Sequence, residues 1–388
     1  MTTAPPSPLK ILHLIATLPV GGAEDLVAAI VRGLDPRRFA VEVACLGELG
    51  AVGQELARQG RQVWALNLDI KRTPFWRLTA EVRALLGKTK PDILHTHLYH
   101  PNLYGRLAAL RLGLKGIVAA VHNSYTRPKL HRRLWNFLLA PTTDYILVGS
   151  SQVWHDVRTY DHVPAGKLIL LPYGIDMAEL ACPLSRQEAQ ARMGVSGFVI
   201  GTVGRLEEQK GHSHLLAAMA QLLPDIPDLT LVLVGDGRQM EALQRQAQDL
   251  GLDPRVHFLG TRRDLPLIYR SLDVFVLPSL WEGLPLALLK AMGAGLPVLA
   301  TRVSGVEEAI EAGVNGLLAP PAHAAALAQA ILWLHQRPEG RAALGLAARC
   351  TIAARYSQEA MLARLAQIYT ELGKKQPNEP LAKCSRRL

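Results

Sequence analysis

Residues 273–301 read DVFVLPSLWEGLPLALLKAMGAGLPVLAT, which is a complete strand–helix–strand unit. The first six and the last five of these residues are almost continuously apolar, as is typical of strands buried on both faces of a parallel sheet. The run between them is long enough for a helix, and Pro285 suits its first turn. Glu282 lies directly ahead of this helix and Lys290 lies on it. The unit predicts a parallel α/β sheet with charged side chains beside one helix.

The same alternation of apolar runs and amphipathic stretches fills the chain and restarts once. Two such series predict an α/β fold of two facing Rossmann-like doubly wound domains. In such a fold, ligands are expected in a deep interdomain cleft, beyond the carboxyl ends of the strands. The predicted strands are 9–17, 39–46, 62–68, 92–97, 116–122 and 144–150 in the first half, and 198–204, 229–235, 255–260, 273–278, 297–301 and 315–320 in the second.

The length of 388 residues also favours two domains. We predict an N-terminal domain at 8–172 and a C-terminal domain at 173–354. A last helix at 355–373 is expected to return to the N-terminal domain, and a disordered basic tail is expected at 374–388.

The composition is that of a globular protein, with 49% hydrophobic and 20% charged residues. No apolar run reaches the roughly 18 residues of a membrane span, and the N-terminus shows no signal-peptide pattern. The four cysteines are scattered without metal-binding spacing and are expected mostly in the core. These features predict a cytoplasmic protein.

Two loops that follow predicted strands carry the clearest chemistry. In GTVGRLEEQKGHSHLL (201–216), Arg205 and Lys210 precede a helix start, an arrangement suited to clamping a diphosphate. The loop lacks the residue order of a P-loop, and two solvated surface cations remain the alternative. In the second loop, Glu282 could accept hydrogen bonds from sugar hydroxyls, although capping of the helix N-terminus would also explain it.

Three backbone features complete the candidate site. Gly21 and Gly22 could let the chain approach a phosphate or a sugar, and Asp236 and Gly237 could lie against a ribose or a base. Both are also ordinary turn residues. The backbone N–H groups that follow Glu282 offer hydrogen-bond donors; they belong to Gly283 and Leu284.

Together these loops resemble the GT-B-fold retaining glycosyltransferases of family 4, the glycosyl transferases group 1. The resemblance covers about residues 9–372 and is strongest in the second half, where its motifs come in the order and spacing of the family. These motifs are GRLEEQKG, VGDG, LPSLWEGLP, AMGAGLPVLAT and VSGVEEAI.

The resemblance implies a hexosyltransferase-like enzyme that needs neither a metal nor a cofactor, with a nucleoside-diphosphate sugar as co-substrate. It implies that Arg205 and Lys210 hold the donor diphosphate and that Glu282 binds the donor sugar. It matches His122 to the histidine that reaches the transferred sugar, and it matches Gly21 and Gly22 to the glycine loop of the N-terminal domain. The leaving phosphate itself would help to deprotonate the acceptor, so no separate base is assigned.

Three positions depart from the family pattern. Lys290 stands where a second glutamate usually accepts hydrogen bonds from the ribose, and lysine can only donate. Asp25 replaces a common arginine, and Tyr173 replaces a usual asparagine. These departures are expected to alter the affinity for the donor and the choice of donor, and the change at Lys290 should have the largest effect.

The acceptor is expected on the N-terminal domain, which is basic. Of the formal net charge of +10, residues 1–172 supply most, with 21 Lys and Arg against 12 Asp and Glu. Segments 71–77 and 126–141 interleave basic with aromatic and apolar residues, which suits an anionic membrane surface on the inner face of the cell membrane. The alternative for each segment is a core-facing helix with a solvated basic face.

We therefore expect sugar transfer to a lipid-linked glycan or a cell-envelope polysaccharide precursor. A nucleotide-sugar epimerase of similar fold and a degenerate sugar-nucleotide-binding protein remain alternatives. A Rossmann oxidoreductase lacks its GxGxxG fingerprint here, and no nucleic-acid-recognition motif occurs. His95 and His97 resemble a pair of metal ligands, but we find no further ligands in the sequence and interpret both as lining the cleft.

Overall fold

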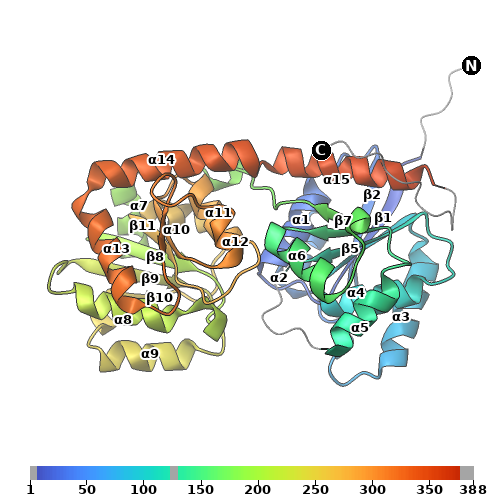
Figure 1. Cartoon of the computed structure of the whole chain (residues 1–388), viewed down its shortest axis with the longest axis horizontal. Coiled ribbons are helices and arrows are strands. Elements are labelled where there is room, and N and C mark those ends of the chain that lie inside the picture. The colour runs from blue at the N-terminus through green and yellow to red at the C-terminus, as the bar shows by residue number, and fades with distance from the viewer. Residues whose placement is uncertain (1–6, 123–129, 376–388) are drawn as a thin grey trace, which may run out of the picture. The chain divides into compact units, whose positions relative to one another are not determined.

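The computed structural model describes residues 7–122 and 130–375. The chain forms two compact units. Unit 1 comprises Met1–Pro172 and Glu359–Leu388, and unit 2 comprises Tyr173–Gln358. Each unit is a parallel sheet with helices on both faces, as the near-continuous apolar runs predict (Figure 1).

Unit 1 has a seven-stranded sheet in the order β3-β2-β1-β4-β5-β6-β7. Six of these strands were predicted from the sequence, and β7 was not. The strands are β1 (Leu9–Ile15), β2 (Phe39–Cys45), β3 (Val63–Ala65), β4 (Ile93–His97), β5 (Gly116–Val121), β6 (Tyr145–Val148) and β7 (Leu168–Leu170). The helices between them are α1 (Gly22–Gly33), α2 (Gly50–Arg58), α3 (Phe75–Thr89), α4 (Tyr99–Ala109), α5 (Leu130–Leu139) and α6 (Ser151–Tyr160).

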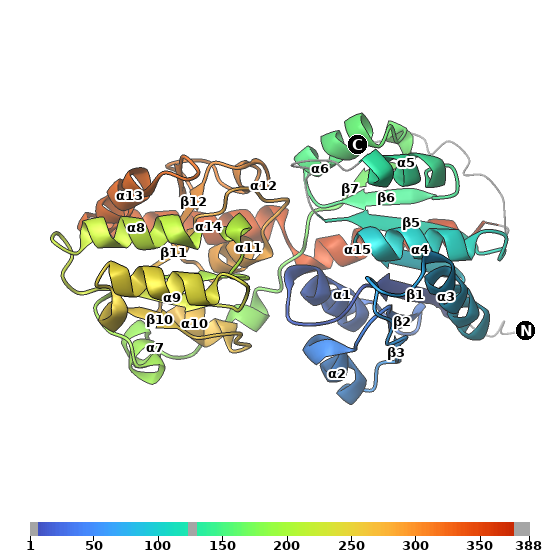
Figure 2. The same ribbon diagram turned by 90° about the horizontal axis from the view of Figure 1, so that it is seen from below.

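The alternation of side chains along the strands assigns each helix of unit 1 to a face. Leu12 and Leu14 pack with buried residues of α3 and α4 on one face, which Figure 2 shows in front of the sheet. Ile15 and Val43 pack with α1 and α2 on the other face. His13 therefore belongs to the face of α1, between two buried isoleucines of the same strand.

Unit 2 has a six-stranded sheet in the order β10-β9-β8-β11-β12-β13, and all six strands were predicted. Helices α8 and α9 lie on one face of this sheet, while α11 and α14 lie on the other (Figures 1 and 2). The strands are β8 (Phe198–Val203), β9 (Leu229–Val234), β10 (Val256–Phe258), β11 (Val274–Leu277), β12 (Val298–Thr301) and β13 (Leu317–Ala319). The α-helices are α7 (Arg186–Met193), α8 (His212–Leu222), α9 (Met240–Asp249), α10 (Leu265–Ser271), α11 (Leu286–Gly293), α12 (Ser304–Glu307), α13 (Ala324–Gln336) and α14 (Pro338–Arg355).

The last helix, α15 (Gln358–Gly373), packs on the sheet of unit 1. A Cβ atom added to Gly33 would lie 2.3 Å from Cδ1 of Leu362, and one added to Gly116 would lie 2.8 Å from Cδ1 of Leu372. Small residues on unit 1 therefore admit the helix closely. Of the tail expected to be disordered, Lys375 forms a 2.6 Å ion pair with Asp144, and residues 376–388 lie outside the described part of the chain.

The cysteines differ from the expectation that most lie in the core. Cys45 is buried, Cys182 is partly buried and Cys350 is exposed; Cys384 lies outside the described residues. Within residues 7–122 and 130–375, no helix combines the length and the apolar character needed to cross a bilayer.

Candidate active site

The loop after β8 holds the two cations of the predicted diphosphate clamp. It continues into a short 3-10 turn that ends at Lys210, and α8 begins two residues later at His212. Gly211 caps this helix with a φ of 62°, and a Cβ there would lie 2.1 Å from the carbonyl oxygen of Pro278. Only glycine fits this position. Arg205 is exposed at the start of the loop, whereas the side chain of Lys210 is 15% exposed.

Lys210 lies against Glu282. Its Nζ atom is 2.6 Å from Oε1 of Glu282, which also accepts a 2.6 Å hydrogen bond from the hydroxyl of Ser279. Glu282 is only 5% exposed. A nearly buried carboxylate is stabilised here because the ammonium group compensates its lost hydration, so removing Lys210 would weaken that compensation. The structure thus joins two of the predicted site residues.

Backbone contacts hold the loop of Glu282 in place. The N–H of Leu280 donates to the carbonyl oxygen of Gln209 over 2.7 Å, and the Gln209 side chain donates to the carbonyl oxygen of Trp281 over 2.9 Å. A Cβ added to Gly305 would lie 1.1 Å from the carbonyl oxygen of Gly283. The backbone of Gly283 and of the buried Leu284 is therefore fixed by its neighbours.

The loop after β9 contacts the loop after β8. The N–H of Leu206 donates to the carbonyl oxygen of Asp236 over 2.9 Å. A Cβ on Gly237 would lie 2.4 Å from the carbonyl oxygen of Leu206. Asp236 also accepts a 2.7 Å hydrogen bond from the N–H of Gly237 through its own side chain. Asp236 and Gly237 consequently lie beside the Arg205 loop.

Lys290 lies in the last turn of α11 and is partly buried. The helix begins at Leu286, so that Pro285 is its N-cap rather than its first helical residue. The hydrogen-bond partners found for Oε1 of Glu282 are Lys210 and Ser279. Lys290 therefore lies on the helix that directly follows the Glu282 loop.

In unit 1, the predicted glycine loop lies at the start of α1. Gly21 is the N-cap, with an extended φ of −179°, and the helix begins at Gly22. A Cβ on Gly21 would lie 2.4 Å from a carboxylate oxygen of Glu24. Because this oxygen ends a flexible side chain that can shift and the backbone is extended, neither a close approach nor strain requires glycine at this position.

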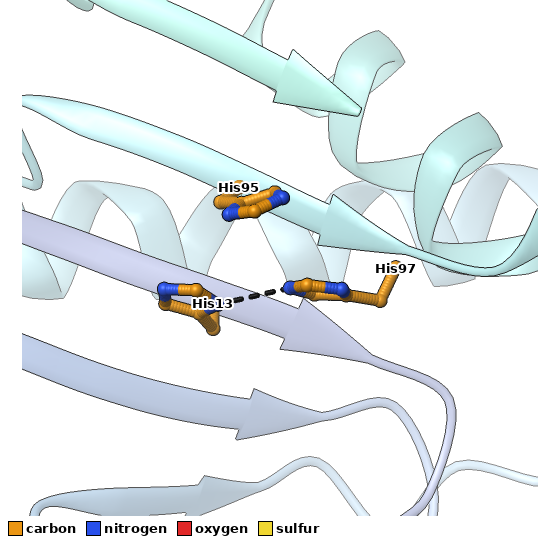
Figure 3. Close-up of side chains that lie close together, drawn as sticks. All are labelled: His13, His95 and His97. Carbon is orange, nitrogen blue, oxygen red and sulfur yellow. Dashed lines mark hydrogen bonds between the residues drawn. The ribbon is translucent and has the colours of Figure 1, made fainter. Parts of the chain in front are cut away.

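His122 follows β5 and joins a cluster of buried rings. Its Nε2 atom is 3.2 Å from Nδ1 of His97, and Nε2 of His97 is 2.9 Å from Nδ1 of His13. His13, His95 and His97 are buried rather than lining an open surface, which corrects the expectation for His95 and His97. Figure 3 shows these three rings, His13 from β1 and the other two from β4.

Tyr369 of α15 closes the cluster. Its hydroxyl is 2.6 Å from Nδ1 of His95 and 3.2 Å from Nε2 of His13. Sequence reasoning missed both His13 and Tyr369. The available signal was a histidine inside an otherwise apolar strand, because the parallel register sets His13 beside His95.

Burial keeps these rings neutral. Loss of hydration lowers the pKa of His13 to about 3 and that of His122 to about 4. It also holds the pKa of His95 and His97 well below the usual value, and repulsion from neighbouring rings adds to the effect. Neutral imidazoles can bind metals or form hydrogen bonds to one another.

The cluster fits hydrogen bonding better than metal binding. One nitrogen from each of His13, His95 and His97 lies within 4.8 Å of the others, which makes them potential metal ligands. However, the 2.9 Å separation of the His13 and His97 nitrogens is a hydrogen-bond length. A divalent ion would also bring its whole charge, without a carboxylate in the group, into an interior that already disfavours a single proton on each ring.

A molecule with two Rossmann-like units, one of which carries a cation–carboxylate pair at its strand ends, has the features of a GT-B glycosyltransferase. Residues 20–179 match the family model described as "Glycosyltransferase Family 4", and residues 197–337 match the model described as "Glycosyl transferases group 1". The chain belongs to this family of glycosyltransferases.

Two relatives illustrate the match. The chain is 33% identical over 211 residues to the UDP-Gal:alpha-D-GlcNAc-diphosphoundecaprenol alpha-1,3-galactosyltransferase of Escherichia coli, covering 51% of this chain and 54% of that enzyme. This chain thus aligns with only about half of that relative. It is 32% identical over 308 residues to the D-inositol 3-phosphate glycosyltransferase of Corynebacterium urealyticum, covering 72% of each chain.

Solved structures share the fold. The crystal structure of Anabaena HepE in complex with UDP-glucose matches with a TM-score of 0.84 at 24% identity, covering 93% of this chain and 99% of that one. The lipopolysaccharide glycosyltransferase WaaG matches with a TM-score of 0.74 at 19% identity, covering 93% of this chain and 99% of that one. At these identities the likeness establishes the GT-B class of both units.

Proposed function

We propose that this glycosyltransferase is a retaining enzyme that moves a sugar from a nucleoside-diphosphate sugar to a hydroxyl of a lipid-linked glycan or a cell-envelope polysaccharide precursor. The observation that carries the proposal is the contact between Lys210 and Glu282. It sets a cation for the diphosphate beside a carboxylate for the sugar, at the positions where the family motifs lie. The E. coli relative, whose name specifies a diphosphoundecaprenol acceptor, supports the acceptor class.

In the proposed reaction, the bond between the anomeric carbon and the donor phosphate oxygen breaks. The acceptor oxygen forms its bond on the same face of the sugar, and its proton passes to the leaving phosphate. Arg205 and Lys210 stabilise the charge that develops on this phosphate, a role that does not require a metal ion. Glu282 accepts hydrogen bonds from the donor sugar, and His122 contacts the transferred sugar.

The remaining predicted residues bind the donor in this proposal. Asp236 and Gly237 lie against the nucleoside, and the N–H groups of Gly283 and Leu284 are offered to the sugar or the phosphate. Gly21 and Gly22 admit substrate at the start of α1. The fixed backbone of Gly283 and Leu284 supports their role, because preorganised donors need little rearrangement on binding.

Replacing Lys290 tests the donor site. We expect the wild type to turn over at least one member of a panel of UDP-, GDP- and ADP-sugars. Lys290→Glu should lower KM for that donor about tenfold, because a carboxylate can accept the hydrogen bonds of the ribose hydroxyls. Lys290→Met, which removes the charge without adding an acceptor, is the matched control. Initial rates with each donor measure the effect.

The outcomes separate the alternatives. Turnover of no donor by the wild type, with activity appearing in Lys290→Glu, would identify a degenerate enzyme. Conversion of the sugar nucleotide without any acceptor would identify an epimerase.

The outer surface of α5 supports a membrane-bound acceptor. Leu130, Leu134, Phe137 and Leu138 recur at helical spacing and are 77%, 54%, 51% and 51% exposed. The opposite side of α5 faces unit 1: Leu139 and Trp135 pack with its core, and Arg106 donates a 2.7 Å hydrogen bond to Asn136. The helix therefore has a core-facing side, as in the alternative for segment 126–141, and also an exposed apolar side. Exposed apolar side chains at this density mark an interaction surface.

The basic residues of that segment divide into two groups. Arg132 lies over the ring of Tyr99 at 4.3 Å, and the Nε–H of Arg133 donates to the carbonyl oxygen of Tyr160 over 2.7 Å. Arg127 and Lys129 lie outside the described residues. In the second segment, 71–77, the aromatic residues Phe75 and Trp76 are also exposed.

We expect the protein to bind vesicles that contain anionic lipid and to be released by salt, because surface charges are screened. The triple variant Leu130→Ser, Leu134→Ser and Phe137→Ser should bind at least about tenfold more weakly, because each substitution removes apolar surface that would contact the bilayer. Leu346→Ser is a matched control, because Leu346 is equally exposed on α14 of unit 2. Co-sedimentation measures binding, and equal binding of the triple variant and the wild type would refute the proposal.

A further inference from the structure

Five side chains of unit 1 form one continuous line of contacts. Starting from His122, His122 contacts His97, His97 contacts His13, His13 contacts Tyr369, and Tyr369 contacts His95. The four separations are 3.2, 2.9, 3.2 and 2.6 Å in this order. The line ends at Nε2 of His95, a buried atom without a hydrogen-bond partner among the described residues.

The hydrogens along this line are linked to one another. A neutral imidazole carries one N–H and one bare nitrogen, and a tyrosine hydroxyl donates once. Each contact needs one hydrogen. If Tyr369 accepted hydrogens from both His13 and His95, its own buried O–H would lack an acceptor among the described residues. Two arrangements remain in which Tyr369 also donates, and in both the position of the hydrogen on one ring determines its position on every other ring.

In the first arrangement every hydrogen points from His95 toward His122. His95 donates from Nδ1 to Tyr369, and its unpartnered Nε2 is a bare lone pair. In the second arrangement every hydrogen points the other way, and Nε2 of His95 carries an N–H that lacks an acceptor. A buried N–H without an acceptor is rarer in proteins than an unused lone pair, so the first arrangement is favoured.

We propose that His97, supported by His13, Tyr369 and His95, fixes His122 as the tautomer with its hydrogen on Nδ1. The proposal rests on the function proposed above for His122. Because Nε2 of His122 is occupied by His97, a hydrogen bond from the ring to the transferred sugar is donated by Nδ1 to a sugar oxygen. His122 is then a hydrogen-bond donor and not a base, and His97 is a positioning residue.

The tautomer is measured directly, without substrate, by NMR of protein labelled with nitrogen-15 in histidine at pH 7.5. The signal of His122 is assigned by its loss in His122→Gln. We expect a hydrogen on Nδ1 and none on Nε2 in the wild type. A neutral histidine in water prefers the opposite tautomer, so this result is not the default.

Two substitutions at His97 separate positioning from packing. His97→Asn keeps an N–H donor near the place of Nδ1 and should retain the tautomer of His122. His97→Leu removes the donor, so that nothing holds the hydrogen of His122 on Nδ1; the Nε2–H form that a neutral histidine prefers in water should then become detectable, with kcat/KM about tenfold lower. Tyr369→Phe is the control for loss of buried hydrogen bonds, because His97 can still donate to His122, and it should leave the tautomer unchanged.

A wild-type His122 with its hydrogen on Nε2 would overturn the proposal, as would an unchanged tautomer in His97→Leu. Stoichiometric binding of Zn²⁺ that shifts the signals of His13, His95 and His97 would also overturn it and assign these rings to a metal. If the wild type transfers no sugar, the proposed function fails, while the tautomer result still decides the inference.

Discussion

Removing both cations of the clamp, by Arg205→Ala together with Lys210→Met, should lower kcat/KM by about 10³ or more. Loss of a single preorganised group that stabilises developing charge costs about 10²–10³ in rate, and these two groups act on the same phosphate. The nucleoside diphosphate should also bind more weakly, because its charge loses two partners. Initial rates and calorimetric titration with UDP, GDP and ADP measure both effects.

The design must separate catalysis from folding, since Lys210 also compensates the nearly buried Glu282. Removing one partner of a buried ion pair destabilises a protein by about 3–5 kcal/mol. Adding Glu282→Gln to Lys210→Met removes the carboxylate charge as well and should recover most of the lost stability, but not the activity. Arg245→Ala, an exposed arginine on α9, is the control for Arg205→Ala. Undiminished turnover and nucleotide binding in the Arg205/Lys210 variant would refute the clamp.

Acid should unfold unit 1 far more readily than unit 2. His13, His95 and His97 have pKa values in the folded state that lie below the ordinary histidine value of 6.5. Above this pH both states are neutral at these rings, and the full stability is present. As the pH falls below it, the unfolded chain takes up protons that the folded chain refuses, so the free energy of unfolding decreases until the folded pKa is reached.

The expected effect is large. Each ring contributes a slope of about 1.4 kcal/mol per pH unit, so three rings contribute up to about 4 kcal/mol per pH unit. Against a typical total stability of about 5–15 kcal/mol, unit 1 should be largely unfolded by about pH 4 to 5. Urea denaturation at pH 7.5, 6.5 and 5.5, with hydrogen exchange read separately for the two units, measures this slope.

Substitutions provide the control for the acid experiment. His95→Gln should reduce the slope of unit 1 by about 1.4 kcal/mol per pH unit, because one titrating ring is lost. His155→Gln, at an exposed position on α6, should leave it unchanged. Equal stability of unit 1 at pH 7.5 and 5.5 would show that the rings can take up protons in the folded state.

The architecture could be predicted from the sequence because each buried parallel strand is a local run of apolar residues. The strand β7 was not predicted because its three residues carry too little pattern and because its pairing with β6 is a long-range contact. The loops of Lys210 and Glu282 were predicted because each directly follows a strand, although their contact joins residues 72 positions apart.

The buried cluster and the orientation of α5 could not be predicted from local sequence patterns. His13 meets His97 only through the register of two strands that are distant in the chain, and Tyr369 arrives from a helix 356 positions after His13. For α5, the spacing of its apolar residues predicts a stripe but not the direction in which it faces. That direction is seen only in the structure, where Leu139 and Trp135 pack with the core of unit 1 and the buried Arg106 binds Asn136 on the same side of the helix.

The placement of α15 has a consequence for biosynthesis. Unit 1 is discontinuous in the chain, since its first 172 residues leave the ribosome long before the helix that bears Tyr369. Unit 2 is continuous and can reach its native state during translation, whereas the nascent N-terminal part must wait for the C-terminal segment with its histidine-bearing face uncovered. Completion of unit 1 thus depends on a helix that is synthesised after unit 2, and a chain that terminates before α15 would expose this surface to chaperones and proteases.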